Sequence, residues 1–249
     1  YEVTVLADEE RGDNTATNFL VTPGDDPGEC VEGDPECTTT NMPEIESSKS
    51  VDPESGSTVV AGQEVTYTLS FTNIGTALGD VDYIDHLSGV FDDAELTAGP
   101  TTSNDAVTAE LEADENLAVS GELEAGETVT VSYTVAVLPD GQRGDNELGN
   151  VLAPTGSKPV CGDDGVSCTN NPIPELEAWK TVDPASGATL APGAEATYTL
   201  HFENTGKAPV DVAKDDVLTQ VLDDADVTTQ PSVSSDSLTA SEIVDGRFA

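Results

Sequence analysis

A lysine, an aspartate and an asparagine occupy positions from which they could form a covalent crosslink. These residues are Lys49, Asp85 and Asn150. In an apolar core a lysine is driven towards its neutral, nucleophilic amine and a carboxylic acid towards its protonated form. The acid can then polarise the asparagine side-chain carbonyl, the amine attacks it, and ammonia leaves. We therefore predict an isopeptide bond with Lys49 as nucleophile, Asp85 as proton shuttle and Asn150 as electrophile. Because the bond forms once per domain, the chain is not expected to be an enzyme with turnover.

Two other interpretations of the same residues remain open. Lys49 and Asp85 could form a buried salt bridge with Asn150 hydrogen-bonded beside it, and such a network would satisfy every group without covalent chemistry. Alternatively, the strand phase that places these side chains inward could be misassigned.

Partial copies of the set occur near both ends of the chain. The equivalents are Lys180 for Lys49, Asp216 for Asp85 and Asn18 for Asn150. The first two are displaced by 131 positions and the third by 132. We predict the same roles for them as for their counterparts.

Strands with one apolar face must position these groups. Successive side chains of a strand point to opposite faces, so "EVTYTLSFT" and "TVTVSYTVAVL" each present a row of apolar residues. By the same alternation Lys49 shares a face with Val51, Asp85 with Leu87, and Asn150 lies between two leucines. Turn signals such as "DPESG" and "PDGQ" separate the runs. The pattern predicts an all-β chain of tandem immunoglobulin-like antiparallel β-sandwich repeats of about 131 residues.

Repeated segments define the expected domains. "KSVDPESGSTVVAGQEVTYTLSFTNIG" from Lys49 recurs as "KTVDPASGATLAPGAEATYTLHFENTG" from Lys180, and "RGDNTATNFL" recurs as "RGDNELGNVL". We expect the C-terminal strands of a preceding repeat, a disulfide linker, one complete β-sandwich repeat, a second disulfide linker and the N-terminal part of a following repeat. Their expected bounds are 1–29, 30–42, 43–160, 161–171 and 172–249.

Four cysteines form two closely spaced pairs in polar segments. Cys30 and Cys37 have the same separation as Cys161 and Cys168. Neither segment contains the four nitrogen or sulfur ligands that a zinc ion needs, and no histidine lies nearby. We predict one local disulfide in each pair, in keeping with an oxidising extracellular location.

Composition excludes several classes of partner. The 249 residues include 49 acidic and only 8 basic side chains, which gives a formal charge of -41. Nucleic acid and anionic membranes would repel such a surface, and no apolar run approaches the roughly 20 residues that span a bilayer. We expect neither nucleic-acid binding nor membrane contact within this segment. Because the chain opens without an initiator methionine or a signal peptide, we expect it to belong to a longer protein.

Three further motifs are assigned no functional role. "RGD" occurs twice, at Arg11 and Arg143, but at the same position of each repeat, which favours a structural role over integrin binding. Acidic clusters such as "DDPGE" could bind calcium, but chance clusters are expected in so acidic a chain, and none has the spacing of an EF-hand loop. His86 and His201 are not repeat equivalents. We predict neither a metal site nor a cofactor.

The repeated segments, with "DDVLTQVLDDADV" and "GDNELGN", resemble repeat domains of Gram-positive, especially actinobacterial, surface proteins of the DUF11 and DUF7927 type. They are also similar in layout to isopeptide-forming domains of fimbrial shafts and adhesin stalks. The resemblance implies a non-catalytic stalk or filament repeat, extracellular and attached to the cell surface or wall. A ligand-binding β-sandwich module is the alternative.

Adjacent repeats of the same protein are the expected partners, together with an unknown host or surface ligand. The end fragments contain only part of a repeat each, and an unpaired sheet edge is prone to aggregation. We expect the remaining strands to come from a longer polyrepeat chain, or from a neighbouring molecule by strand donation, which would build a filament.

Overall fold

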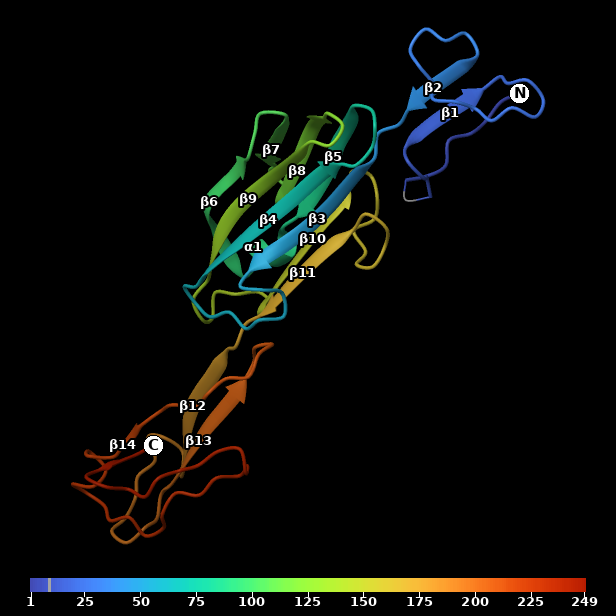
Figure 1. The fold of residues 1–249 in the computed structure, drawn as a ribbon. Coiled ribbons are helices and arrows are strands. Elements are labelled where there is room, and N and C mark those ends of the chain that lie inside the picture. Colours follow the sequence, from blue (N-terminus) through green and yellow to red (C-terminus); the bar gives the residue numbers. More distant parts are fainter. Residues whose placement is uncertain (9) are drawn as a thin grey trace. The chain divides into compact units, whose positions relative to one another are not determined.

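Alternating apolar residues build the first sheet of the central repeat (Figure 1). In this computed structural model, which describes residues 1–8 and 10–249, four antiparallel strands lie in the order β3-β4-β9-β6. They are β3 (Ile45–Asp52), β4 (Glu64–Asn73), β9 (Thr128–Val137) and β6 (Ala94–Thr102). Every second residue of β4 and β9 is buried, as the sequence predicts.

A second antiparallel sheet packs against the first. Its strand order is β11-β10-β5-β8-β7, and the short helix α1 (Ser88–Phe91) follows β5. Its strands are β5 (Gly79–His86), β7 (Val107–Leu111), β8 (Asn116–Leu123), β10 (Glu147–Pro154) and β11 (Ser167–Pro172). The predicted all-β sandwich is therefore confirmed.

One apolar core lies between the two sheets. Its largest fully buried side chains include Tyr67 and Phe71 of β4, Leu117 of β8 and Leu148 of β10. Burial of apolar surface is the main driving force for folding, so this cluster fixes which face of each strand points inward. The inward phase of β3, β5 and β10 places their polar residues at the edge of the same core.

The segment after β10 differs from the expected linker. Residues 161–171 were expected to connect domains, but Ser167–Pro172 form β11, an edge strand paired with β10. Asn171 is fully buried, and its Nδ2 donates to the backbone oxygens of Pro53, Glu54 and Ser57 in the turn after β3. The unit that contains the central repeat accordingly ends at Ile173, a core residue.

The partial copies contribute short hairpins. Before the sandwich, β1 (Thr15–Phe19) pairs with β2 (Cys37–Asn41). The second unit, residues 174–249, contains β12 (Leu176–Asp183) paired with β13 (Thr197–Asn204), and β14 (Asp216–Val217) paired with β15 (Arg247–Phe248).

No helix in the described ranges, 1–8 and 10–249, has the length and hydropathy of a membrane-spanning segment.

Candidate functional site

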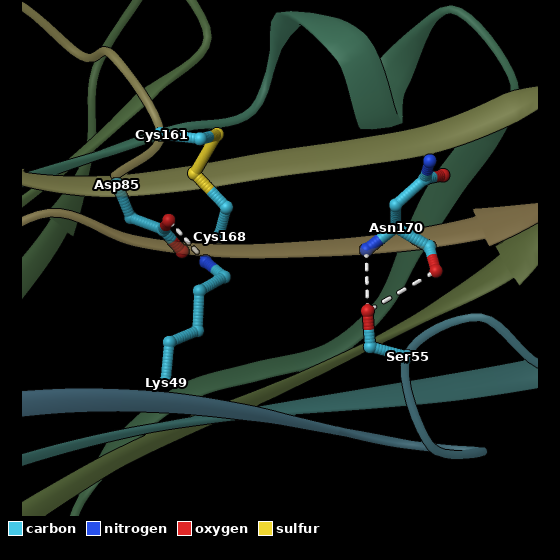
Figure 2. The surroundings of a disulfide bond; sticks show 6 residues. All are labelled: Lys49, Ser55, Asp85, Cys161, Cys168 and Asn170. Atoms are coloured by element: carbon cyan, nitrogen blue, oxygen red, sulfur yellow. Dashed lines mark hydrogen bonds and ion pairs between the residues drawn. A yellow bond between two sulfur atoms is a disulfide. The ribbon is translucent and has the colours of Figure 1, made fainter. Parts of the chain in front are cut away.

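Lys49 and Asp85 meet between the two sheets. Lys49 comes from β3 and Asp85 from β5, and both side chains are completely buried. Lys49 Nζ forms an ion pair with Asp85 Oδ1, and Figure 2 shows the two side chains pointing at each other. Lys49 Nζ also lies 5.3 Å from the ring centroid of Tyr67, within range of a cation–π interaction. The sequence-predicted pair is thus brought into direct contact.

Tyr133 links this pair to Asn150. Its hydroxyl donates to Asp85 Oδ2 at 2.5 Å and accepts from Asn150 Nδ2 at 2.6 Å. Tyr133 comes from β9 and Asn150 from β10, so four strands supply one connected group. We call Lys49, Asp85, Tyr133 and Asn150 the four-residue cluster. The sequence predicted a direct contact of Asp85 with the Asn150 carbonyl, whereas the structure places the tyrosine hydroxyl between them.

The carbonyl oxygen of Asn150 is not used by the cluster. Asn150 is only 1% exposed, and among the described residues its Oδ1 has no hydrogen-bond partner. A buried acceptor without a donor costs about 1–3 kcal/mol. The simple network considered above would satisfy every polar group, and the observed one does not. The Asn150 amide is therefore held through its nitrogen, and its carbonyl oxygen is not polarised by a hydrogen bond from Asp85 in this arrangement.

Burial makes Lys49 easier to deprotonate. Desolvation lowers the pKa of Lys49 from 10.5 to about 8, although the charge of Asp85 and its hydrogen bond act in the opposite direction. Burial, followed by the Asp85 charge, raises the pKa of Tyr133 well above its usual value, so the phenol keeps its proton. A buried amine with a lowered pKa and a nearby proton acceptor is the arrangement expected of a nucleophilic lysine.

The lowered pKa predicts a pH-dependent stability in a variant that cannot crosslink, Asn150→Ala. Lys49 then loses its proton near pH 8 in the folded domain but only near its ordinary value of 10.5 in the unfolded chain. Between these values the unfolded state binds more protons, so the free energy of unfolding rises with pH, by about 1.5 kcal/mol from pH 8 to about 9.5. Below pH 8 the burial penalty is fully present.

Urea unfolding of Asn150→Ala at several pH values measures this slope. The double variant Lys49→Met, Asn150→Ala lacks the titrating amine and should lose the slope. A free energy of unfolding that stays constant or falls over this range would contradict the expectation.

Each half of the four-residue cluster occurs a second time. Lys180 Nζ contacts both carboxylate oxygens of Asp216, at 2.6 and 2.8 Å. Asn18 Nδ2 donates to the hydroxyl of Tyr1 at 2.9 Å, and Tyr1 is the repeat equivalent of Tyr133. The Lys180 and Asp216 side chains are 38% and 11% exposed, unlike the central pair. The pairing of lysine with aspartate, and of tyrosine with asparagine, is therefore a property of the repeat.

Sequence reasoning missed the role of Tyr133. It assigned Tyr133 to the apolar face of its strand, and the polar tip of that side chain was not given a partner. The signal was present, because Tyr1 and Tyr133 are 132 positions apart, as are Asn18 and Asn150. A tyrosine that recurs with the acceptor asparagine could have been included in the set.

Both predicted disulfides are formed. Cys30 is bonded to Cys37 and Cys161 to Cys168. Cys168 lies on β11 directly opposite Val151, the neighbour of Asn150 on β10. Figure 2 also shows Ser55, whose Oγ accepts from the Asn170 backbone N at 2.9 Å. The disulfide and this bond hold β11 at the edge of the sandwich, beside the strand that carries Asn150.

The two RGD arginines have intramolecular partners. Arg11 donates to Pro43 O at 2.8 Å, and its side chain is 10% exposed. Arg143 donates to Leu138 O at 2.8 Å and to Asn146 Oδ1 at 2.6 Å, and its side chain is fully buried. These contacts support the structural interpretation of both motifs.

One acidic cluster outside the site has a structural explanation. Carboxylate oxygens of Asp92, Asp93 and Asp145 lie within 4.8 Å of one another. Asp93 is fully buried and accepts from the backbone N of Asn146 and Glu147 at 3.1 and 3.2 Å. It therefore fixes the start of β10.

The two histidines have partners outside the four-residue cluster. His86 Nδ1 is 3.1 Å from Asn116 Oδ1, and His201 stacks on Trp179 with ring centroids 4.9 Å apart. These contacts give both histidines a packing or hydrogen-bonding role.

A family model described as a domain of unknown function, DUF7927, matches residues 44–173 and 175–249. No curated protein matches the sequence.

Several solved structures are similar to this chain at low identity. The major pilin subunit BcpA of Bacillus cereus shares 9% identity at a TM-score of 0.38, with 77% of this chain and 63% of that chain covered. Domains D2 and D3 of the major pilin SpaD from Corynebacterium diphtheriae share 18% at 0.33, with 57% of each chain covered. The collagen adhesin CNA from S. aureus shares 10% at 0.31, with 68% and 56% covered. The chain spans about three fifths of the length of these structures.

Proposed function

The chain belongs to the DUF7927 family, and from that premise we propose that it is a non-catalytic stalk repeat of a cell-surface protein, closed by an isopeptide bond between Lys49 and Asn150. The observation that carries the proposal is the four-residue cluster. It combines a buried lysine whose pKa is lowered to about 8, an aspartate in contact with it, and a buried asparagine connected to that aspartate through the Tyr133 hydroxyl.

The chemistry of closure follows from these contacts. The Lys49 ammonium transfers a proton to Asp85, which leaves a neutral amine beside a neutral acid. The amine nitrogen then attacks the side-chain carbon of Asn150, the carbon–nitrogen bond to the amide nitrogen breaks, and ammonia departs. The product joins β3 to β10, which belong to different sheets. The reaction consumes its own side chains and so occurs once in each domain.

Contacts between one repeat copy and the next support a stalk. Asn14, from the tail of the preceding copy, donates Nδ2 to Glu44 Oε2 at 2.6 Å. The backbone oxygen of Asn14 accepts hydrogen bonds from Met42 N at 2.9 Å and from Thr76 Oγ1 at 2.5 Å. A Cβ added to Gly75 would lie 2.5 Å from Met42 O, so the turn after β4 closely approaches the segment that leads into the central repeat. Such a joint limits bending between copies, which a spacing function requires and ligand recognition does not.

The extracellular setting is supported by the two disulfides, because such bonds persist in oxidising compartments. A charge of -41 keeps a surface-exposed segment hydrated and disfavours association with other acidic surfaces. We accordingly propose that adjacent repeats are the principal partners and that the segment is displayed outside the cell.

Mass spectrometry tests the bond directly. The reduced wild-type chain should weigh about 17 Da less than its sequence mass, because closure releases one ammonia. Protease digestion should yield a branched peptide that contains Lys49 joined to Asn150. Asn150→Ala should restore the full sequence mass and give separate linear peptides. Linear peptides from the folded wild-type chain would refute the crosslink.

A further inference from the structure

Tyr133 occupies the only hydrogen-bonded path, among the described residues, from Asp85 to the nitrogen that must leave. Its hydroxyl lies 2.5 Å from Asp85 Oδ2 and 2.6 Å from Asn150 Nδ2. The ion pair with Lys49 uses the other carboxylate oxygen, Oδ1. Asp85 therefore faces the proton donor with one oxygen and the tyrosine with the other, and a turn of the protonated carboxyl carries the proton from the first side to the second.

We propose that Tyr133 is a catalytic residue of bond formation, which relays a proton from Asp85 to the departing amide nitrogen of Asn150. The inference rests on the proposed crosslink and adds a step that the lysine, aspartate and asparagine alone do not supply. An amide nitrogen leaves poorly unless it is protonated, and the four-residue cluster places the tyrosine hydroxyl at that atom.

The proton transfers balance as follows. Lys49 first gives one proton to Asp85, and its neutral Nζ bonds to the side-chain carbon of Asn150 as the carbonyl electron pair moves to Oδ1. When the pair returns, the bond to Nδ2 breaks. The protonated Asp85 carboxyl turns so that its proton lies on the oxygen beside Tyr133, and the tyrosine hydroxyl turns its own proton from Asp85 to Nδ2. Tyr133 then gives that proton to Nδ2 and receives the proton of Asp85. The surplus proton on Nζ passes to the carboxylate that Asp85 has become. The products are the secondary amide, one ammonia, an unchanged tyrosine and a neutral Asp85.

The second tyrosine–asparagine pair, Tyr1 with Asn18, supports a role of the tyrosine at the asparagine that forms the bond. The hydroxyl of Tyr1 accepts from Asn18 Nδ2 at 2.9 Å, in a segment where no lysine–aspartate pair accompanies it among the described residues. The tyrosine thus accompanies the asparagine even when the nucleophile and the acid are elsewhere.

Tyr83 provides a matched control. It is a buried tyrosine of β5, and its ring packs on that of Phe71 with centroids 5.0 Å apart. Among the described residues its hydroxyl makes no hydrogen bond to the four-residue cluster. Tyr83→Phe and Tyr133→Phe therefore each remove one phenol oxygen from the core side of the sandwich, but only the second interrupts the proposed relay.

The experiment follows closure in time. The 249-residue chain is recovered unfolded and uncrosslinked, and it is then refolded by dilution. Samples are quenched in acid at successive times, and mass spectrometry measures the loss of ammonia in each. We expect Tyr133→Phe to slow closure by about 100-fold or more, the usual contribution of a positioned general acid, and Tyr83→Phe to close at the wild-type rate. Fluorotyrosines of graded acidity, placed at position 133, should change the rate in proportion to the acidity of the phenol.

The outcomes separate the two proposals. Closure of Tyr133→Phe at the wild-type rate would overturn the relay and leave the crosslink intact. A rate that is independent of phenol acidity would also overturn it, because the tyrosine would then only position Asn150. A wild-type chain that never loses ammonia would remove the crosslink itself. If Tyr133→Phe does not fold, as judged by circular dichroism, the fluorotyrosine series decides.

Discussion

Replacing Asp85 with alanine should lower the free energy of unfolding of the central repeat by about 3–5 kcal/mol relative to the uncrosslinked variant Asn150→Ala, because it leaves a buried charge without its partner. Lys49 and Asp85 are both fully buried, and they form one ion pair. The alanine also removes the acceptor of the Tyr133 hydroxyl, which lies 2.5 Å from Asp85 Oδ2. Because the same carboxyl is the proposed proton shuttle, the variant should remain uncrosslinked.

Denaturant unfolding followed by far-ultraviolet circular dichroism measures the loss of unfolding free energy. The intact mass of the same samples measures closure. To separate the loss of the ion pair from the loss of the crosslink, Asp85→Ala is compared with Asn150→Ala, which is also uncrosslinked but retains the ion pair. Asp80→Ala, on the exposed face of the same strand, should change neither quantity. Equal stabilities of Asp85→Ala and Asn150→Ala would contradict the expected penalty of an unpaired lysine.

Much of the sandwich follows from local sequence. The apolar rows of β4 and β9 obey a period of two, and the same phase extended to β3 and β5 places Lys49 and Asp85 inward. The internal repeat adds evidence that alternation alone lacks, because a polar residue that recurs on an apolar face is not accidental. Membership in the DUF7927 family, also expected from the repeated segments, is confirmed by the match over 44–173 and 175–249.

What the sequence did not predict depends on contacts between distant segments. β11 has no apolar alternation, and its place in the sheet comes from pairing with β10 and from the bonds of Asn171 to the turn after β3. Tyr133 lies directly opposite Tyr67 in the β4–β9 ladder, and only the packing of the second sheet brings its hydroxyl between Asp85 and Asn150. Side-chain order within a buried cluster is set by this packing and not by strand phase.

The crosslink should also change how far the repeat extends under force. Lys49 lies near the start of the central repeat and Asn150 near its end. A bond between them transmits the pulling force directly, so residues 50–149 do not extend. Without the bond, residues 44–173 can extend by about 450 Å at roughly 3.5 Å per residue. With the crosslink, only the short segments outside 49–150 can extend. The Cys161–Cys168 disulfide keeps the loop between its cysteines closed whether or not the crosslink is present.

Single-molecule pulling on the full chain should therefore show a large extension step in Asn150→Ala that is reduced to roughly a fifth or less in the wild type. In the chain-entropy model, a closed loop of about 100 residues also stabilises the folded state by about 4–5 kcal/mol. Asn170→Ala, an exposed asparagine on the neighbouring strand β11, serves as the control and should extend like the wild type. Equal step lengths in wild type and Asn150→Ala would mean that tension passes through the folded strands alone, and the stalk would then have no covalent path through this repeat.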